Sequence, residues 1–315
     1  MSADNCEAED TSLRCAACGI AEDDDVKLKK CNGCYLVRYC GVECQREHRL
    51  KHKQACKKRA AELRDELLFK QPESSHRGDC PICMVPLPLG LKNCTMMTCC
   101  SKFICDGCNY ANQMREIETR RDQKCPFCRE AAPETGAECD KQRMKRIEIN
   151  DPVAMRKEGK KQYSKGDYHS AFEYYTKAAE LGDVEAHYEL SNLYRWGEGV
   201  EKDMGESMNH AEEAAIGGHP YARHNLGAYE WINGDKKRAM KHWIISATQG
   251  DDKSIKGLIE GFKEGLMGKE DLNATLRAHQ ATLNSMKSPQ REAAEKCNKM
   301  MMQAMTPTIE SRQVK

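Results

Sequence analysis

The sequence predicts a mainly α-helical chain in which two small cysteine-rich modules precede an α-solenoid. The first observation is that 18 of the 19 cysteines lie within the first 139 residues, at short recurring intervals. The second is that the chain repeats itself after residue 152, at offsets of 36 and then 32 residues. Short cysteine intervals are typical of metal ligands rather than disulfides, and repeats of this length are typical of stacked helix pairs.

Composition limits the classes of function and the compartment. A length of 315 residues suggests two or three domains, and a net charge of +1 gives no global field that would favour nucleic acid. Residues 1–14 form an acidic N-terminal tail, whereas residues 27–70 hold 13 basic and five acidic groups, which favours acidic partners. The start, MSADNCEAED, lacks the parts of a signal peptide, and no apolar run is long enough to span a membrane. We therefore expect an intracellular protein, of the cytoplasm or the nucleus.

The first cysteine ladder, residues 15–56, contains four pairs of ligand-type side chains. A two-residue spacer lets one tight turn present both sulfurs to an ion, and a three-residue spacer places a pair on one helical face. The segment CQREHRLKHKQAC is therefore expected to be helical. Eight ligands suit two tetrahedral zinc ions. The expected ligands are Cys15, Cys18, Cys31, Cys34, Cys40, Cys44, His52 and Cys56.

This ladder resembles the MYND zinc finger, because it has YC at 39–40, CQ at 44–45 and HK..C at 52–56. The resemblance implies alternate pairing, with Cys15, Cys18, Cys40 and Cys44 on one zinc and Cys31, Cys34, His52 and Cys56 on the other. It leaves His48 outside the ligand set. The resemblance also implies peptide binding, but Arg49 stands where the family often carries Trp. The alternative to peptide binding is a module that zinc holds in its folded form and that has no binding role of its own.

Residues 57–79 are expected to form a helix and a linker. The stretch KKRAAELRDELLFKQ is rich in helix formers and extends the preceding helix. Residues 71–78, QPESSHRG, combine proline, glycine and polar residues, which indicates a linker.

The central ladder, residues 80–129, contains three plain pairs, each with two residues between its cysteines: Cys80 with Cys83, Cys105 with Cys108, and Cys125 with Cys128. The fourth pair must come from Cys94, Cys99 and Cys100. The ladder resembles a RING finger, in which the first and third pairs bind one zinc and the second and fourth bind the other. The usual histidine is missing, and Lys102 cannot replace it because an ammonium has no lone pair. We choose Cys99 and Cys100, which makes an all-cysteine variant, and Cys94 is the competitor.

The RING resemblance implies ubiquitin ligation by docking a charged ubiquitin-conjugating enzyme, with zinc in a structural role and no catalytic nucleophile. It implies docking positions at Ile82, Pro126 and Arg129, although Asn112 stands where the family commonly has a groove tryptophan. The alternatives are local packing for Ile82 and a solvated charge for Arg129. Residues 130–151 look like a polar linker in which Cys139 is a spare thiol.

The repeats of residues 152–286 align AAELGD at 178–183 with AAIGGH at 214–219 and SATQGD at 246–251. Small residues permit close helix approach, and a glycine after each second helix provides a left-handed cap. The units resemble Sel1-like repeats, which are related to tetratricopeptide repeats. Four units are expected, near 152–183, 184–219, 220–251 and 252–286, with the last serving as a cap, and a polar tail follows at 287–315. The repeat histidines are scattered over different units and are expected to pack or face solvent: His210, His219, His224 and His242.

Two functions from different classes follow. In the first, a zinc-binding scaffold with four zinc ions acts as a RING-type ubiquitin ligase that recruits substrate through its repeats. In the second, a non-catalytic adaptor binds proteins or peptides through the MYND finger and the repeats. Nucleic acid is disfavoured as a partner, because the basic segment 27–70 lacks interleaved aromatics beyond Tyr35 and Tyr39.

Overall fold

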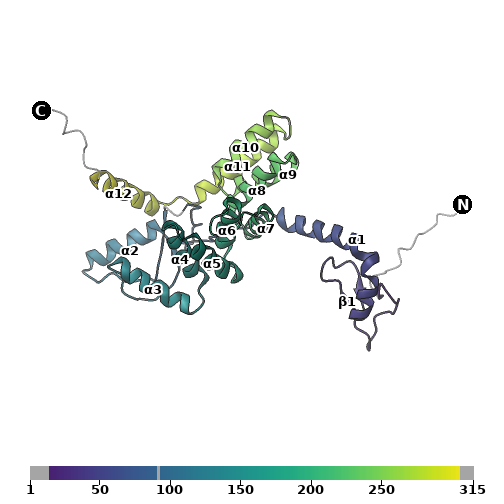
Figure 1. Cartoon of the computed structure of the whole chain (residues 1–315). Coiled ribbons are helices and arrows are strands. Elements are labelled where there is room, and N and C mark those ends of the chain that lie inside the picture. The colour runs from purple at the N-terminus through teal and green to yellow at the C-terminus, as the bar shows by residue number, and fades with distance from the viewer. Residues whose placement is uncertain (1–13, 91–92, 306–315) are drawn as a thin grey trace. The chain divides into compact units, whose positions relative to one another are not determined.

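A computed structural model describes residues 14–90 and 93–305, with side chains up to residue 301. The chain divides into two compact units, the first ending at Lys70 and the second beginning at Gln71 (Figure 1). The fold class predicted from the sequence is confirmed: the described residues are mainly helical, and a helical array follows two cysteine-rich modules. Within those residues, no helix is both long and apolar enough to cross a membrane.

The first unit combines a small antiparallel ribbon with one long helix. Strands β1 (Lys29–Lys30) and β2 (Arg38–Tyr39) pair, and helix α1 spans Val42–Leu68. Its apolar core is small and consists largely of sulfur-bearing side chains around Leu28 and Tyr39. The helix continues well beyond the ladder because residues 57–68 are strong helix formers.

The central module opens the second unit. Strands β3 (Cys94–Met96) and β4 (Phe103–Cys105) form an antiparallel pair, and helix α2 (Asp106–Glu118) follows directly. Cys105 is the N-cap of α2, and its sulfur accepts a hydrogen bond from the backbone N–H of Cys108. The cap therefore sets the second member of this cysteine pair on the first turn of the helix.

The segment 130–151, expected to be a linker, instead contains helix α3 (Gly136–Glu148). Thr135 caps this helix by accepting from the N–H of Glu138, and the Glu138 carboxylate accepts from the N–H of Glu134. This resembles a capping box, which is a local sequence signal for the start of a helix. The polar composition of the segment indicates a linker instead. Arg143 of α3 then forms an ion pair of 2.8 Å with Glu158 of the next helix, which joins α3 to the array.

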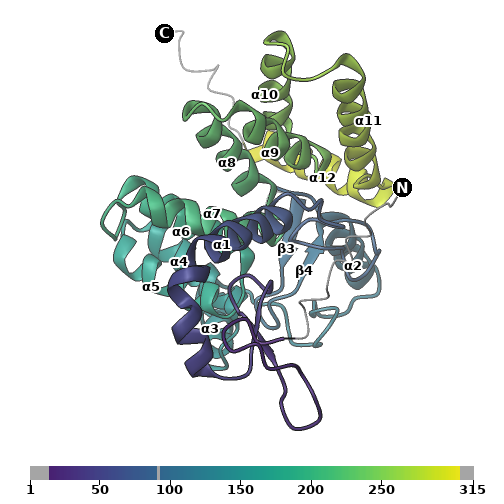
Figure 2. The same cartoon turned by 90° about the vertical axis from the view of Figure 1, so that its right-hand side faces the viewer.

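The array consists of eight helices that pack as consecutive antiparallel neighbours, stacked in chain order from teal to green in Figure 2. Buried alanines, among them Ala171, Ala178 and Ala222, let the helices approach closely. The glycines that follow the second helix of the first three pairs, Gly182, Gly218 and Gly250, adopt positive φ as expected for left-handed caps. The helices are α4 (Pro152–Ser164), α5 (Tyr168–Glu180), α6 (Val184–Trp196), α7 (Met204–Ile216), α8 (Pro220–Ile232), α9 (Lys236–Thr248), α10 (Asp252–Lys263) and α11 (Lys269–Ser285).

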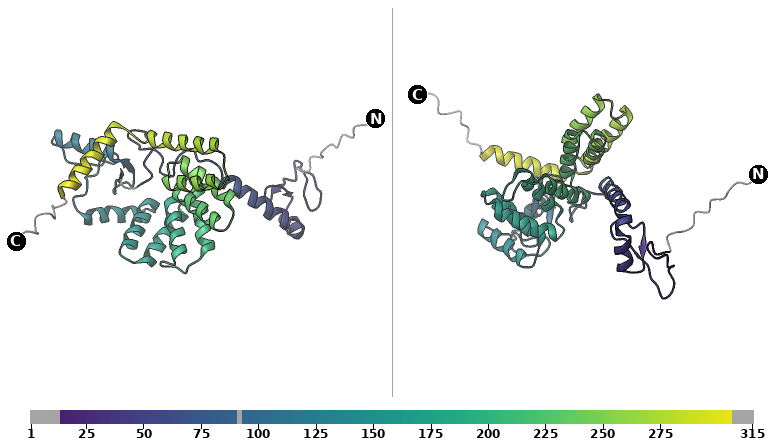
Figure 3. Two further views of the ribbon diagram at one scale, coloured as in Figure 1. Left: turned by 90° about the horizontal axis from the view of Figure 1, so that it is seen from above. Right: turned by 45° about the vertical axis from the view of Figure 1, so that its right-hand side comes forward.

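Part of the polar tail expected at 287–315 is also helical. Helix α12 (Pro289–Met305) packs against α2 of the central module (Figure 3). The contact is close, because a Cβ atom on Gly107 would lie 2.7 Å from the backbone nitrogen of Arg291. Only glycine fits at this position. Gly107, which lies between two cysteines of the central ladder, therefore allows α12 to pack closely against α2.

Candidate metal centres

The first unit gathers its eight expected ligands into two groups of four. In the group of Cys15, Cys18, Cys40 and Cys44, the sulfurs of Cys18 and Cys40 lie 3.6 Å apart and those of Cys40 and Cys44 lie 3.5 Å apart. Four sulfurs around a tetrahedral zinc at a Zn–S distance of about 2.3 Å are separated by about 3.8 Å. This donor set therefore fits a structural zinc ion.

The second group of this unit consists of Cys31, Cys34, His52 and Cys56. The sulfurs of Cys31 and Cys56 are 3.8 Å apart, and Nε2 of His52 lies 3.2 Å from the sulfur of Cys34. His48 stands outside both groups, with its Nδ1 3.1 Å from the hydroxyl of Tyr39. The arrangement is the alternate pairing expected from the MYND resemblance.

The central ladder forms a third group from Cys80, Cys83, Cys105 and Cys108. The sulfurs of Cys83 and Cys105 are 3.8 Å apart, and the backbone N–H of Cys105 donates to the sulfur of Cys80 at 3.4 Å. Burial alone would raise the pKa of Cys80, but backbone N–H donors, that of Cys105 foremost, lower it to about 7. These donors stabilise the thiolate form that zinc binds.

Helix α12 adds a cation to this third group. The guanidinium of Arg291 donates to the carbonyl oxygens of Pro86 at 2.7 Å and Val85 at 3.0 Å, and lies 3.8 Å from the sulfur of Cys83. A zinc ion with four thiolates carries a net negative charge, which a nearby guanidinium offsets. The sequence offered no signal for this contact, because Arg291 and Cys83 are 208 residues apart.

The fourth group consists of Cys99, Cys100, Cys125 and Cys128. The sulfur of Cys100 lies 3.7 Å from that of Cys125, and the sulfur of Cys99 lies 3.3 Å from that of Cys128. A turn closed by hydrogen bonds from the N–H groups of Cys100 and Ser101 to the carbonyl of Met97 lets two adjacent cysteines face the same point.

The competitor Cys94 lies outside the fourth group. Its sulfur is 3.5 Å from a guanidinium nitrogen of Arg77 and 3.9 Å from the carbonyl oxygen of Gly90. Burial raises the pKa of the Cys94 thiol. Lys102, at the position of the usual RING histidine, extends over the ring of Phe127. Neither side chain is placed to complete a zinc site.

The three docking positions expected from the RING resemblance do not share one cavity. Pro126 and Asn112 line a cavity of about 300 Å³, whose wall also includes Cys139 of α3. Ile82, which is 45% exposed, and Arg129, which is exposed, lie outside that lining. This cavity is thus bordered by α3, in the segment that follows the module.

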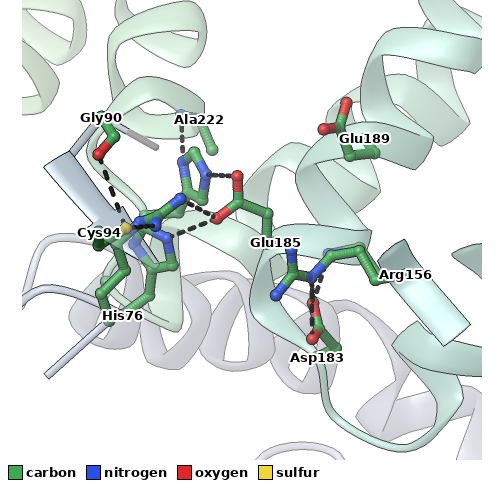
Figure 4. A network of polar contacts seen from close by, with 12 residues as sticks. His76, Gly90, Cys94, Arg156, Asp183, Glu185, Glu189 and Ala222 are labelled. Carbon is green, nitrogen blue, oxygen red and sulfur yellow. Dashed lines mark hydrogen bonds and ion pairs between the residues drawn. The ribbon is translucent and has the colours of Figure 1, made fainter. Parts of the chain in front are cut away.

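A fifth group was not expected from the sequence: His76, Glu185 and His219. Figure 4 labels two of these residues, His76 and Glu185. Nε2 of His76 lies 2.9 Å from Oε2 of Glu185, and Nε2 of His219 lies 4.0 Å from Oε1. The guanidinium of Arg77 donates to the same Oε2 at 3.0 Å. Burial alone would raise the pKa of Glu185, but these donors lower it well below its usual range.

The proton positions argue against a metal ion in this fifth group. The backbone N–H of Ala222 donates to Nδ1 of His219 at 3.2 Å, so the neutral imidazole carries its proton on Nε2, facing Glu185. A metal ion would have to displace that proton and sit beside the guanidinium of Arg77. We therefore describe these residues as a carboxylate latch, the Glu185 latch, which ties residues 76 and 77 to the array.

The Glu185 latch shows that residues 71–78, expected to be a linker, pack on the array. The N–H of His76 donates to the carbonyl of Gly218 at 3.3 Å, and the hydroxyl of Thr248 donates to Gln71 at 3.2 Å. His219 is almost fully buried, and its ring stacks on that of His76 with centroids 4.3 Å apart. A packing or surface position was expected for His219, and its buried, stacked ring agrees with packing.

Comparison with known proteins identifies two of the three modules. The MYND finger family model matches residues 15–56, and the Sel1 repeat model matches residues 155–183, 184–219 and 220–251. Neither model's matched ranges include residues 57–154. None of the curated proteins matches the chain significantly.

Two solved structures are similar to this chain. A Sel1 repeat protein from Oxalobacter formigenes is 21% identical with a TM-score of 0.42, over 62% of this chain and 86% of that one. The protective antigen c5321 of uropathogenic Escherichia coli strains, which has an SLR fold, is 19% identical with a TM-score of 0.37, over 58% of this chain and 39% of that one. From the family models, the chain contains a zinc-binding MYND finger and three Sel1 repeats, and both are protein-interaction modules.

Proposed function

We propose that this scaffold binds four zinc ions and acts as a RING-type ubiquitin ligase, with substrates recruited by the Sel1 repeats or the MYND finger. The observation that carries the proposal is the pair of interleaved four-sulfur groups in residues 80–129. Pairs one and three form one group and pairs two and four form the other, as in a RING finger. The expected ligands of the four ions are the sixteen side chains of the two ladders.

Zinc would have a structural role in this activity. It would hold the loop that carries Ile82 and the loop that carries Pro126 and Arg129, and no side chain of the chain would attack the thioester. The exposed Ile82 would dock a ubiquitin-conjugating enzyme through an apolar contact, and the exposed Arg129 would contact ubiquitin. Catalysis would consist of restricting the thioester to reactive orientations.

The second candidate is an adaptor that transfers nothing. It is favoured by Asn112, because an amide at the groove position offers less apolar contact than the tryptophan common in the RING family. In this case the central module would serve to anchor α12 and the array.

Reconstituted ubiquitin transfer with a panel of conjugating enzymes separates the two. The zinc-loaded full chain should promote transfer with at least one enzyme, and Ile82→Ala should reduce the rate about tenfold or more, as loss of a central apolar anchor does at other interfaces. Ile149→Ala, which removes another exposed isoleucine (63% exposed), is the matched control. Native mass spectrometry must find four zinc ions in every variant. If ubiquitin transfer is absent, or does not depend on zinc and Ile82, the ligase proposal is wrong and the adaptor function is favoured.

A further inference from the structure

Helix α1 has two halves with different electrostatic properties. In the C-terminal half, Arg59 forms ion pairs with Glu62 at 3.2 Å and Glu66 at 2.9 Å. The part of the helix before Arg59 exposes six basic side chains that have no ion pair among the described residues. They are Arg46, Arg49, Lys51, Lys53, Lys57 and Lys58.

Three of these cations lie on the side of α1 that faces away from the metal groups. Cys44, His52 and Cys56 turn one side of the helix toward the finger. At about 100° per residue, Arg46, Lys53 and Lys57 fall within roughly 40° of one another on the other side. Leu50 lies on the same side and is 86% exposed, more than any other large apolar residue among the described ones. We call these four residues the α1 basic face.

The like charges on this half of the helix repel one another. Arg49 and Lys53, and Lys53 and Lys57, are spaced four residues apart, which brings them together on the helix surface. The only acidic residues of this half are Glu43 and Glu47, whereas Arg59 further along is neutralised by two carboxylates. The helix therefore retains an unfavourable charge pattern that an anionic partner would relieve.

We propose that the α1 basic face binds an acidic protein segment, with carboxylates against Arg46, Lys53 and Lys57 and a large apolar side chain against Leu50. The position of Leu50 among the cations favours protein over nucleic acid, because an isobutyl group offers nothing to a phosphate backbone but packs well against an apolar side chain. Arg49, which replaces the tryptophan common in the MYND family, widens the positive surface. The surface is independent of ubiquitin transfer, because it uses no residue of the central module.

The test measures fluorescence anisotropy of a labelled 16-residue peptide of glutamate and alanine with two leucines, added to the zinc-loaded full chain at moderate salt. Triple charge reversal, Arg46→Glu with Lys53→Glu and Lys57→Glu, should weaken binding by about tenfold or more, and Leu50→Ser by about threefold to tenfold. Reversal of the exposed Lys27, Lys29 and Lys30 to glutamate changes the charge equally elsewhere on the unit and should change affinity less than about twofold.

Two further probes complete the design: a peptide with both leucines replaced by serine, and a DNA duplex of equal charge. The proposal requires the leucine peptide to bind more tightly than either. Tighter binding of the duplex would establish a nucleic-acid surface instead. Equal loss in the two triple variants, or no binding of the acidic peptide, would overturn the assignment of this face. Native mass spectrometry of the zinc content shows that the exposed substitutions leave the finger folded.

Discussion

The two cysteine-rich modules use similar chemistry but are supported differently. Each brings eight ligand-type side chains into two groups of four. The MYND finger belongs to a compact unit that ends at Lys70 and has a core of its own. The central module contacts α12 through Arg291 and the array through Phe103, and the Glu185 latch ties the segment just before the module to the array. Ligand spacing alone therefore does not show whether a metal module folds as a separate unit.

The two modules are supported differently because they bury different apolar side chains. The core of the MYND finger contains Leu28 and Tyr39 and is otherwise made mostly of cysteines, so zinc must supply much of its folding free energy. The central module also buries Ile104 and Leu87, and Phe103 lies beneath the cations of Arg77 and Lys157. The central module is therefore stabilised partly by its contacts with neighbouring helices.

The largest expected effect is that of zinc removal. A strong chelator should unfold the MYND finger completely, so that amide hydrogen exchange in residues 15–56 becomes unprotected, while helices α4 to α11 remain protected. In the second unit, the loss of protection should spread from residues 80–129 to α12, because Arg291 contacts the loop after Cys83. Exchange mass spectrometry checks both. Protection of residues 15–56 that survives chelation would show that the finger does not depend on metal.

The next effect concerns the Glu185 latch. Glu185→Gln should lower the free energy of unfolding of the second unit by about 3 to 5 kcal/mol, because Arg77, with its side chain 8% exposed, loses its counter-charge. Glu173→Gln, on an exposed side chain of α5, is the control. Urea denaturation gives the free energies. The zinc count should stay unchanged, and a variant that loses one zinc ion would show that His76, Glu185 and His219 hold a metal.

Acid should weaken the array through His219. Burial lowers the pKa of His219 from 6.5 to about 4, so as pH falls below 6.5 the unfolded chain takes up a proton that the folded chain refuses until about pH 4. Stability is therefore lost across this window, by up to about 3 kcal/mol from this group. His219→Asn keeps a cap for the N–H of Ala222 and does not titrate. Urea midpoints at pH 7 and pH 4.5 should differ less in this variant than in the parent chain, and an equal difference would contradict the assignment.

The smallest effect is expected at the junction of α12 with the central module. Arg291→Met keeps the length of the side chain but removes the hydrogen bonds to Val85, Pro86 and Met286, and should cost about 1 to 3 kcal/mol. Arg115→Met, on an exposed position of α2, is the control. Trypsin should cleave within α12 faster in the Arg291 variant. Equal cleavage rates would show that α12 is held by its other contacts.

The sequence by itself determined the features that depend on local spacing. Ligand pairs such as Cys15 and Cys18 can be recognised because two or three intervening residues bring both donors to one point. The helix pairs of the array were predictable from their period, and the three matched Sel1 repeats coincide with the expected units at 184–219 and 220–251 and nearly with the first. The cap of α3 at Thr135 is also a local signal, although the polar composition around it predicts a linker.

Only the tertiary structure decided which side chains meet across long stretches of chain. It placed Cys99 and Cys100 in the fourth group and Cys94 beside Arg77. It turned the expected linker at 71–78 into part of the array surface, through a contact between His76 and Glu185 that spans 109 residues. A buried charge is stable only with a partner, and a partner so distant leaves no periodic trace in the sequence.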